Sequence, residues 1–181
     1  LKGDIKMSAA FFQVTALVVS ALSFGFAVWL YKWVQSQPSS NKKIAEVGEL
    51  IRRGANTFLA KEYKTLARFV SIVGLLILVF LPEPIWIGGF AKNIVMTAAF
   101  VCGTIFSAFA GKIGIQIATI ANIKSAEAAK KGIRTSFMSA FRGGSVMGIA
   151  VVGASLIGVS GLLLLTGNTT ALLGFSFGAS S

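Results

Sequence analysis

The sequence has 181 residues, of which 55% are hydrophobic and only 13% are charged. Because soluble domains carry roughly 25% charged residues, this composition excludes a disordered chain and argues against a soluble enzyme. The net charge of +11 would suit nucleic-acid binding, but the basic residues lie between long apolar runs, which favours a membrane protein. The chain has no histidine and a single cysteine, Cys102, so it can form neither an internal disulfide nor a thiolate metal cage.

The first predicted span covers residues 7–31, a run without charge. It is long enough to cross the hydrocarbon core, which takes about 20 residues. The run ends in an aromatic belt around an interfacial lysine, formed by Trp29, Tyr31, Lys32 and Trp33. A secretory signal peptide is the alternative, but its apolar region would be shorter and would close on a small-residue cleavage site.

The second predicted span covers residues 57–81. The charge-free part of this span, residues 69–81, is too short to cross the membrane and is followed by two prolines. The helix is therefore expected to begin near residue 57, with the lysine and arginine side chains of its first turns reaching the membrane–water interface. Apolar residues at steps of three and four already predict a helix over residues 42–63. Gly48 and Gly54 weaken that prediction, because each disfavours a helix by about 1 kcal/mol relative to alanine.

The third predicted span covers residues 93–123, and its apolar pattern continues past Lys112. We expect one helix that leaves the membrane and extends into the cytoplasm. The charge-free carboxyl-terminal part is divided by a Gly-Asn-Thr-Thr segment into a fourth span over 143–166 and the start of a fifth from residue 170. The predicted fold class is an all-α integral membrane protein with four transmembrane helices plus the start of a fifth.

Basic residues predict the orientation, because lysine and arginine bias short loops toward the cytoplasm. Residues 32–68 carry eight basic and three acidic side chains, and residues 112–142 carry six and one. The amino-terminal tail and the 82–92 turn are almost neutral. Loops 32–68 and 112–142 are therefore predicted to be cytoplasmic and the amino terminus extracytoplasmic. These charges either act only as topology signals or also attract an anionic ligand or lipid.

Small residues recur at every fourth position in the third and fourth spans, a spacing that lets helix backbones approach in lipid. The rows are Ala99, Gly103, Ser107, Gly111; Ala110, Gly114, Ala118, Asn122; Ala140, Gly144, Gly148; and Ala150, Ala154, Gly158. They predict a packed polytopic bundle. Chance is the alternative in a chain with 20 glycines.

The sequence offers little catalytic chemistry. It has no phosphate-binding loop, and the runs 7–31, 93–111 and 143–181 lack the charged groups that membrane enzymes and pumps use. Glu62 and Glu127 are predicted to pair with lysines. Four polar residues, Asn93, Gln116, Thr119 and Asn122, are expected to make core hydrogen bonds, with a polar seam as the alternative. We therefore predict no catalytic, cofactor-binding or metal-binding residue in this chain.

Four stretches carry a more specific signal. They are residues 51–64 (IRRGANTFLAKEYK), 114–129 (GIQIATIANIKSAEAA), 140–148 (AFRGGSVMG) and 174–181 (GFSFGASS). In this order and spacing they resemble the amino-terminal quarter of the membrane-bound, ion-pumping pyrophosphatases. The region before residue 42 matches only as a hydrophobic span.

The resemblance implies a homodimer in the lipid bilayer, each subunit a bundle of about sixteen helices held by close helix packing. Members hydrolyse pyrophosphate with Mg²⁺ and pump protons, sodium ions or both out of the cytoplasm. It leaves open which ion moves here and whether K⁺ is needed. Amino termini in the family face outward, in agreement with the charge count. The spans of this chain would be mostly outer scaffold.

The family's Mg²⁺ and pyrophosphate ligands lie in a later aspartate-rich motif that these residues do not include, so no catalytic position is carried over. We expect the chain to be part of a longer enzyme and inactive alone, since a natural end inside an apolar helix would leave carbonyls unpaired in lipid. The alternative is a non-enzymatic multi-helix membrane subunit or small transporter, although a transporter should carry intramembrane charges or broken helices. A nucleic-acid partner is not expected.

Overall fold

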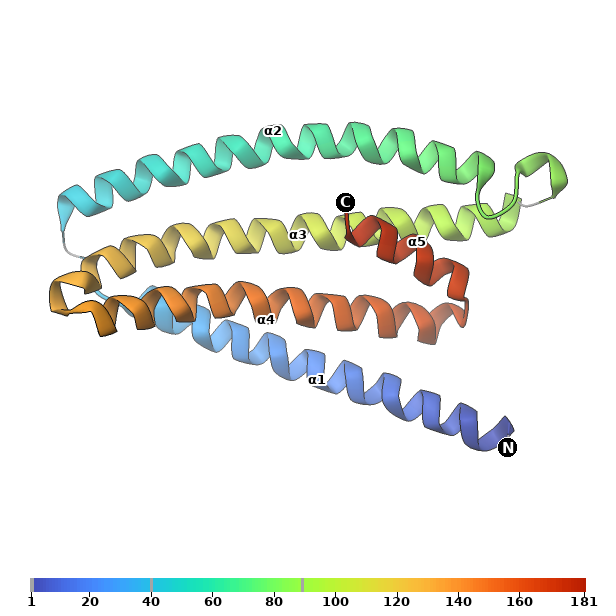
Figure 1. Ribbon diagram of the computed structural model, residues 1–181, viewed down its shortest axis with the longest axis horizontal. Helices are drawn as coiled ribbons and strands as arrows, with labels where there is room; N and C mark the ends of the chain where they lie inside the picture. Colours follow the sequence, from blue (N-terminus) through green and yellow to red (C-terminus); the bar gives the residue numbers. More distant parts are fainter. Residues whose placement is uncertain (1, 40, 89) are drawn as a thin grey trace. The chain divides into compact units, whose positions relative to one another are not determined.

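The structure is a computed structural model that describes residues 2–39, 41–88 and 90–181, with side chains described from Phe11 onward. These residues form helices and no strand, which confirms the all-α class. In chain order the long helices are α1 (Lys2–Ser36), α2 (Lys42–Phe80), α3 (Phe90–Ala128) and α4 (Ile133–Thr166), followed by the shorter α5 (Thr169–Ala179) (Figure 1). The side chains of Lys2, Asp4 and Lys6, which enter the charge count, lie outside the described residues.

Four helical segments of the described chain are long and apolar enough to cross a membrane. They are Phe11–Ser36, Lys42–Ile87, Phe90–Lys131 and Ile133–Thr166. The four predicted spans correspond to them in order, and α5 takes the place of the expected fifth. Large apolar side chains such as Leu22, Ile72 and Ile105 are at least 60% exposed along these helices, as expected for surfaces that face lipid or further apolar helices. The chain is a multi-pass integral membrane protein.

The two basic segments, 32–68 and 112–142, are mostly helical, in agreement with the helix predicted over residues 42–63 and with the predicted extension of the third span past Lys112. Residues 32–68 and 112–142 are interrupted only near 37–41 and 129–132. The 39 residues of α2 extend about 58 Å, nearly twice the thickness of the hydrocarbon core. A charged segment can lie outside the bilayer and remain helical, because a helix satisfies its own backbone hydrogen bonds in water as well as in lipid.

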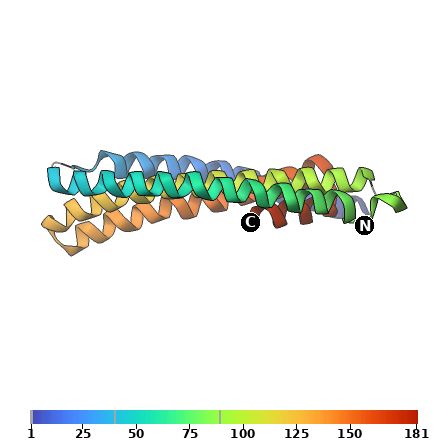
Figure 2. The ribbon, with the colours of Figure 1, turned by 90° about the horizontal axis from the view of Figure 1, so that it is seen from above.

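The chain forms two compact units, and each long helix contributes a part to both. Unit 1 consists of residues 1–21, 63–109 and 153–181, and unit 2 of residues 22–62 and 110–152. Within unit 2, successive helical segments run in alternating directions, as Figures 1 and 2 show. The same alternation holds within unit 1, where α5 reverses after α4.

The core of unit 2 joins α1, α3 and α4. Its buried residues are Leu30, Val34, Ile117, Ala121 and Val146. Helix α2 packs onto α3 at Gly48, where a Cβ atom would collide with the Ile123 side chain. This close contact explains why glycine is accepted in the second turn of α2 despite its low helix propensity.

The core of unit 1 is built around α5, which crosses α3 with almost no side chain between the backbones. Ala99, Ala171 and Phe175 form the buried cluster. A Cβ atom at Gly178 would overlap the carbonyl oxygen of Phe100, and one at Gly174 would overlap that of Met96. This glycine pair, spaced four residues apart, therefore holds α5 against α3 as small residues do in membrane helices.

The predicted small-residue rows are confirmed at some positions and not at others. Added Cβ atoms would meet a carbonyl of α5 at Gly103, the Met147 sulfur at Gly114 and the Phe175 ring at Gly158. At Gly111, Gly144 and Gly148 no described atom of another helix lies within 4 Å of such a Cβ. Only part of each row therefore packs against a neighbouring helix of the described chain.

Asn93 closes the connection between α2 and α3 in unit 1. Its side chain is fully buried and its amide nitrogen donates to the carbonyl oxygens of Leu78 at 3.0 Å and Glu83 at 2.7 Å. It thereby satisfies carbonyls that the end of a helix leaves without partners. The expectation that Asn93 makes core hydrogen bonds is confirmed.

Candidate functional site

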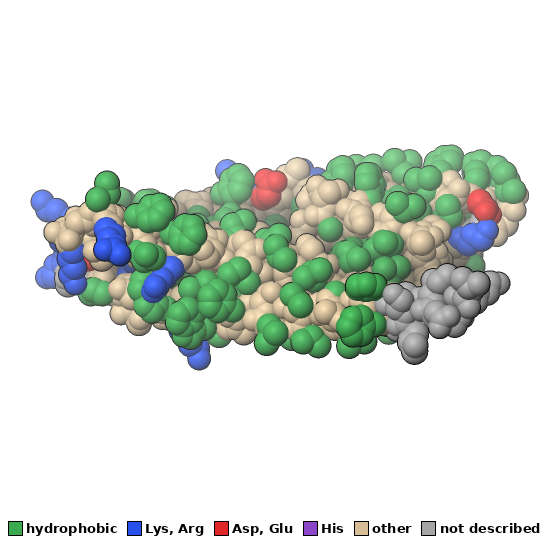
Figure 3. Space-filling model, turned by 60° about the horizontal axis from the view of Figure 1, so that its bottom comes forward, with side chains coloured by type: hydrophobic (Ala, Val, Ile, Leu, Met, Phe, Trp, Pro, Cys, Tyr) green, Lys and Arg blue, Asp and Glu red, His purple; other side chains and the backbone are tan. Residues whose placement is uncertain are grey.

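Basic side chains gather at one end of unit 2, where the α1–α2 and α3–α4 connections meet (Figure 3). Two hydrogen bonds join these connections. The backbone nitrogen of Asn41 donates to Glu127 Oε2 at 3.1 Å, and Lys124 Nζ donates to the carbonyl oxygen of Gln37 at 2.5 Å. The region thus combines a strong positive charge with a defined backbone arrangement.

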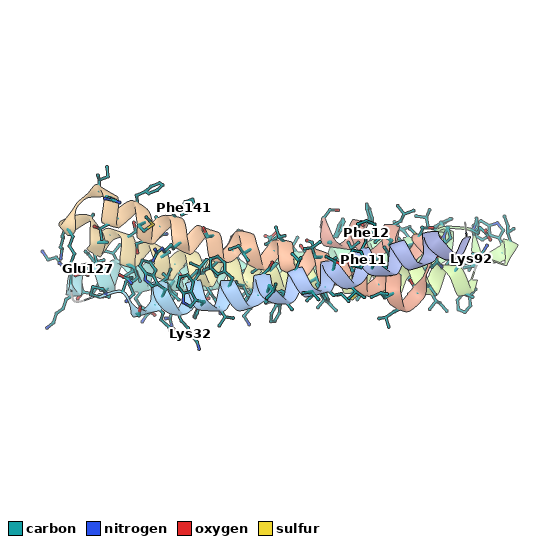
Figure 4. All side chains as sticks on the ribbon, turned by 90° about the horizontal axis from the view of Figure 1, so that it is seen from below. Phe11, Phe12, Lys32, Lys92, Glu127 and Phe141 are labelled. Carbon is teal, nitrogen blue, oxygen red and sulfur yellow. The ribbon has the colours of Figure 1, made fainter. Side chains whose placement is uncertain are left out.

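Glu127 is the buried acid of this end, with only 8% of its surface exposed. It receives the Asn41 hydrogen bond and lies 3.6 Å from the ammonium of Lys130. The prediction that Glu127 is a charge partner for a lysine is therefore confirmed (Figure 4). The same prediction for Glu62 is wrong: Glu62 is exposed and has no ion-pair partner among the residues that the structure describes.

Helices α3 and α4 are joined by two serines. Ser125 Oγ donates to the carbonyl oxygen of Ser136, and Ser136 Oγ donates to that of Ser125, both at 3.0 Å. Farther along α4, the guanidinium of Arg142 lies 3.9 Å from the ring centre of Trp33 on α1. This is a cation–π distance, so part of the predicted aromatic belt also joins two helices.

A polar pocket of about 310 Å³ lies between α1, α2 and α3 in unit 2. Its polar lining consists of one guanidinium, three amides and two hydroxyls, from Arg52, Gln35, Asn56, Gln116, Tyr31 and Thr119. None of the residues that line it is acidic. Such a set of donors fits an anion or another ligand rich in acceptor oxygens.

Helix periodicity brings these donors together. Tyr31 and Gln35 are four residues apart on α1, Arg52 and Asn56 are four apart on α2, and Gln116 and Thr119 are three apart on α3. Each pair therefore lies on one face of its helix. The pocket takes Arg52 and Asn56 from the first quoted stretch and Gln116 and Thr119 from the second.

The predicted polar residues divide between different places. Gln116 and Thr119 line the polar pocket, Asn122 lines a mostly apolar pocket between α2 and α3, and Asn93 belongs to unit 1. Reasoning from the sequence missed Arg52, Asn56 and Gln35 as pocket residues. The i,i+4 spacing on α2 was visible in the sequence, but which face of α2 meets α3 was not.

The acidic residues do not form a metal site in the described chain. No group of three or more histidine, cysteine, aspartate or glutamate side chains occurs there in a position to hold a metal ion. Glu83 and Glu49 are paired instead, with Lys92 at 2.7 Å and Arg53 at 3.4 Å. The residues present therefore do not fit a magnesium site, because Mg²⁺ in proteins takes oxygen ligands with carboxylates among them.

Comparison with known proteins gives a consistent result. The family model described as inorganic H⁺ pyrophosphatase matches residues 21–181. The chain is 37% identical to a K⁺-insensitive pyrophosphate-energized proton pump of Methanosarcina mazei over 166 residues, covering 92% of this chain and 23% of that pump. It is 33% identical to a K⁺-stimulated pyrophosphate-energized sodium pump of Thermotoga maritima over 152 residues, covering 83% of this chain and 19% of that pump. The chain thus spans less than a quarter of the length of these relatives.

Proposed function

The chain belongs to the H⁺ pyrophosphatase family, and from this premise we propose that it is part of a membrane pump that couples pyrophosphate hydrolysis to ion transport. The observation that carries the proposal is the match of residues 21–181 to the family model. Relatives named as proton pumps and as sodium pumps both match at above 30% identity. The transported ion is therefore a proton, a sodium ion or both.

Within such a pump, the helices of this chain act as scaffold. The four long helices are continuous, and the acids of the described residues are exposed, paired with bases or hydrogen-bonded. Mg²⁺, when bound, would offset the phosphate charge, and its ligands would come from other parts of the protein. Helices α3 and α5 supply a closely packed face.

The charge distribution supports one orientation for the scaffold. The connections near 37–41 and 129–132 belong to unit 2, which carries most of the lysines and arginines. By the positive-inside rule this end of unit 2 lies in the cytoplasm, and the amino terminus and the 82–92 turn lie outside. Pyrophosphate would then be hydrolysed on the side where α2 and α3 extend beyond the bilayer.

The test uses the full-length polypeptide that carries this chain, purified and reconstituted into lipid vesicles. We expect phosphate release from pyrophosphate that requires Mg²⁺, together with acidification of the vesicle lumen or uptake of ²²Na⁺. An ionophore that collapses the gradient serves as the control for coupling. A folded, reconstituted protein that releases no phosphate under these conditions would contradict the proposal.

A further inference from the structure

A separate apolar groove adjoins the polar pocket of unit 2. The groove has a volume of about 250 Å³ and lies between α1, α3 and α4. It shares Tyr31 and Gln116 with the polar pocket. The rest of its lining is apolar, from Phe24, Ala27, Val28, Ile113, Val146 and Ala150. The two hollows adjoin at Tyr31 and Gln116, one with a polar lining and one with an apolar lining, and together they are called the depression below.

The polar pocket and the apolar groove lie where the headgroup and an acyl chain of a membrane lipid would lie. Tyr31 belongs to the predicted interfacial belt of α1, and Asn56 directly precedes the predicted second span. Phe24 lies two helical turns before Tyr31, about 10 Å farther into the apolar part of α1. The polar pocket is thus at headgroup level, and the groove leads from it toward the hydrocarbon core.

The charge of the polar end favours an anionic ligand. Arg52 lines the pocket, and its ion pair with Glu49 at 3.6 Å joins side chains that are 60% and 46% exposed. Such exposed pairs are weak, so the guanidinium is available to a phosphate, which it can bind through two parallel hydrogen bonds. Lys32, adjacent to Tyr31, projects from α1 away from the neighbouring helices (Figure 4) and adds positive charge.

We propose that this depression binds one anionic glycerophospholipid, with its phosphate at Arg52 and the neighbouring amides and one acyl chain in the groove. Free phosphate or pyrophosphate would satisfy the polar end but leave the groove unfilled. A neutral lipid would fill the groove without a charge for Arg52. The proposal concerns unit 2 alone and does not depend on the pump activity.

The test measures lipid retention by the full-length protein that carries this chain. After exchange into detergent with added phosphatidylglycerol, native mass spectrometry should show one lipid bound more tightly than phosphatidylcholine. Arg52→Gln should weaken this binding about tenfold, the effect of removing one charge-assisted hydrogen-bonded contact. Arg53→Gln is the matched control, because Arg53 also pairs with Glu49 at 3.4 Å but does not line the pocket.

The groove is tested separately by Val28→Trp, which places a large ring at an exposed position of the apolar lining. Phosphatidylglycerol retention should fall as it does for Arg52→Gln. Equal losses in Arg52→Gln and Arg53→Gln would show diffuse attraction and overturn the proposal. Full displacement by millimolar phosphate, with no effect of Val28→Trp, would show a site for the free anion and would overturn it as well.

A measurement on the unaltered protein covers the case in which a variant fails to fold. Phosphatidylglycerol with a photoreactive diazirine in its acyl chain should cross-link mainly to residues 24–31 of α1 and 113–116 of α3. Cross-links distributed evenly along all exposed helix faces would show only bulk lipid contact and would reject the site.

Discussion

Asn93 is a single side chain on which a whole helix connection depends. It is fully buried and donates two hydrogen bonds to carbonyls near the end of α2. One turn later on α3, the hydroxyl of Thr97 is buried without a hydrogen-bond partner in the described chain. The Oδ1 of Asn93 is likewise buried without a partner in the described chain, so Asn93 combines two paired N–H donors with one unpaired oxygen, whereas the Thr97 hydroxyl has no partner at all.

Replacing Asn93→Leu is expected to lower the free energy of unfolding by about 2–4 kcal/mol, because two carbonyls lose their partners in an apolar setting. Thr97→Val, the matched control, removes only an unpaired hydroxyl and should be neutral or slightly stabilising. Thermal unfolding of the purified protein in detergent, followed by tryptophan fluorescence, compares the two. Equal transition temperatures for both variants would show that the Asn93 hydrogen bonds do not hold the connection.

At the level of helices, the features that the sequence predicted are those that depend only on the residues within each helix. Four runs of apolar residues predicted the membrane-crossing helices, since length and hydropathy are properties of each segment alone. The helix over residues 42–63 and the extension of the third span past Lys112 were also predicted, whereas the start of α4 at Ile133, ten residues before the predicted fourth span, was missed because that segment is polar and basic. The glycines of α5 were also missed, because their importance comes from the α3 backbone opposite them, at Met96 and Phe100.

The polar pocket shows the same limit. Nothing in the local sequence distinguishes Arg52, Asn56 and Gln116 from other polar residues on a helix. They line one pocket because α2 and α3 are oriented with these residues facing each other. Periodicity predicts which residues share a face, but it does not state which face meets which neighbour. The pocket therefore could not be predicted from a single sequence.

Gly103 and Gly111 belong to one small-residue row on α3 and should respond oppositely to alanine. A Cβ at Gly103 would overlap the carbonyl oxygen of Phe175, whereas one at Gly111 meets no described atom of another helix within 4 Å. Gly103→Ala should destabilise the protein by about 1–3 kcal/mol through overpacking. Gly111→Ala should stabilise it by about 0.5–1 kcal/mol through the lower backbone entropy of its unfolded state.

The same thermal unfolding assay tests this pair, with helix content from circular dichroism as a check that both variants fold. A destabilising Gly111→Ala would show that this face of α3 is closely covered in the complete protein. A neutral Gly103→Ala would show that α5 does not cross α3 as closely as described.

For the molecule as a whole, the arrangement of charge predicts that this polypeptide alone cannot turn over substrate. The described residues hold no cluster of three or more acidic, histidine or cysteine side chains. We expect the 181-residue polypeptide, expressed alone and shown to be helical in detergent, to release no phosphate from pyrophosphate with Mg²⁺. The full-length protein, prepared in parallel, is the positive control. Turnover by the isolated polypeptide would place a catalytic site among these residues.

The distribution of charge also predicts the orientation of the chain in the membrane, which can be measured by labelling single-cysteine variants. Cys102 is the only cysteine of these 181 residues, so in this polypeptide a Cys102→Ala background allows Lys131→Cys and Ile87→Cys to be labelled one at a time. Both positions are exposed, Lys131 in the α3–α4 connection and Ile87 in the α2–α3 connection. A membrane-impermeant maleimide added to intact cells should label Ile87→Cys at once and Lys131→Cys only after the membrane is permeabilised, because the positive-inside rule predicts a cytoplasmic location for the lysine- and arginine-rich connections. The reverse pattern would invert the topology, moving the polar pocket of unit 2 and the proposed lipid to the opposite leaflet.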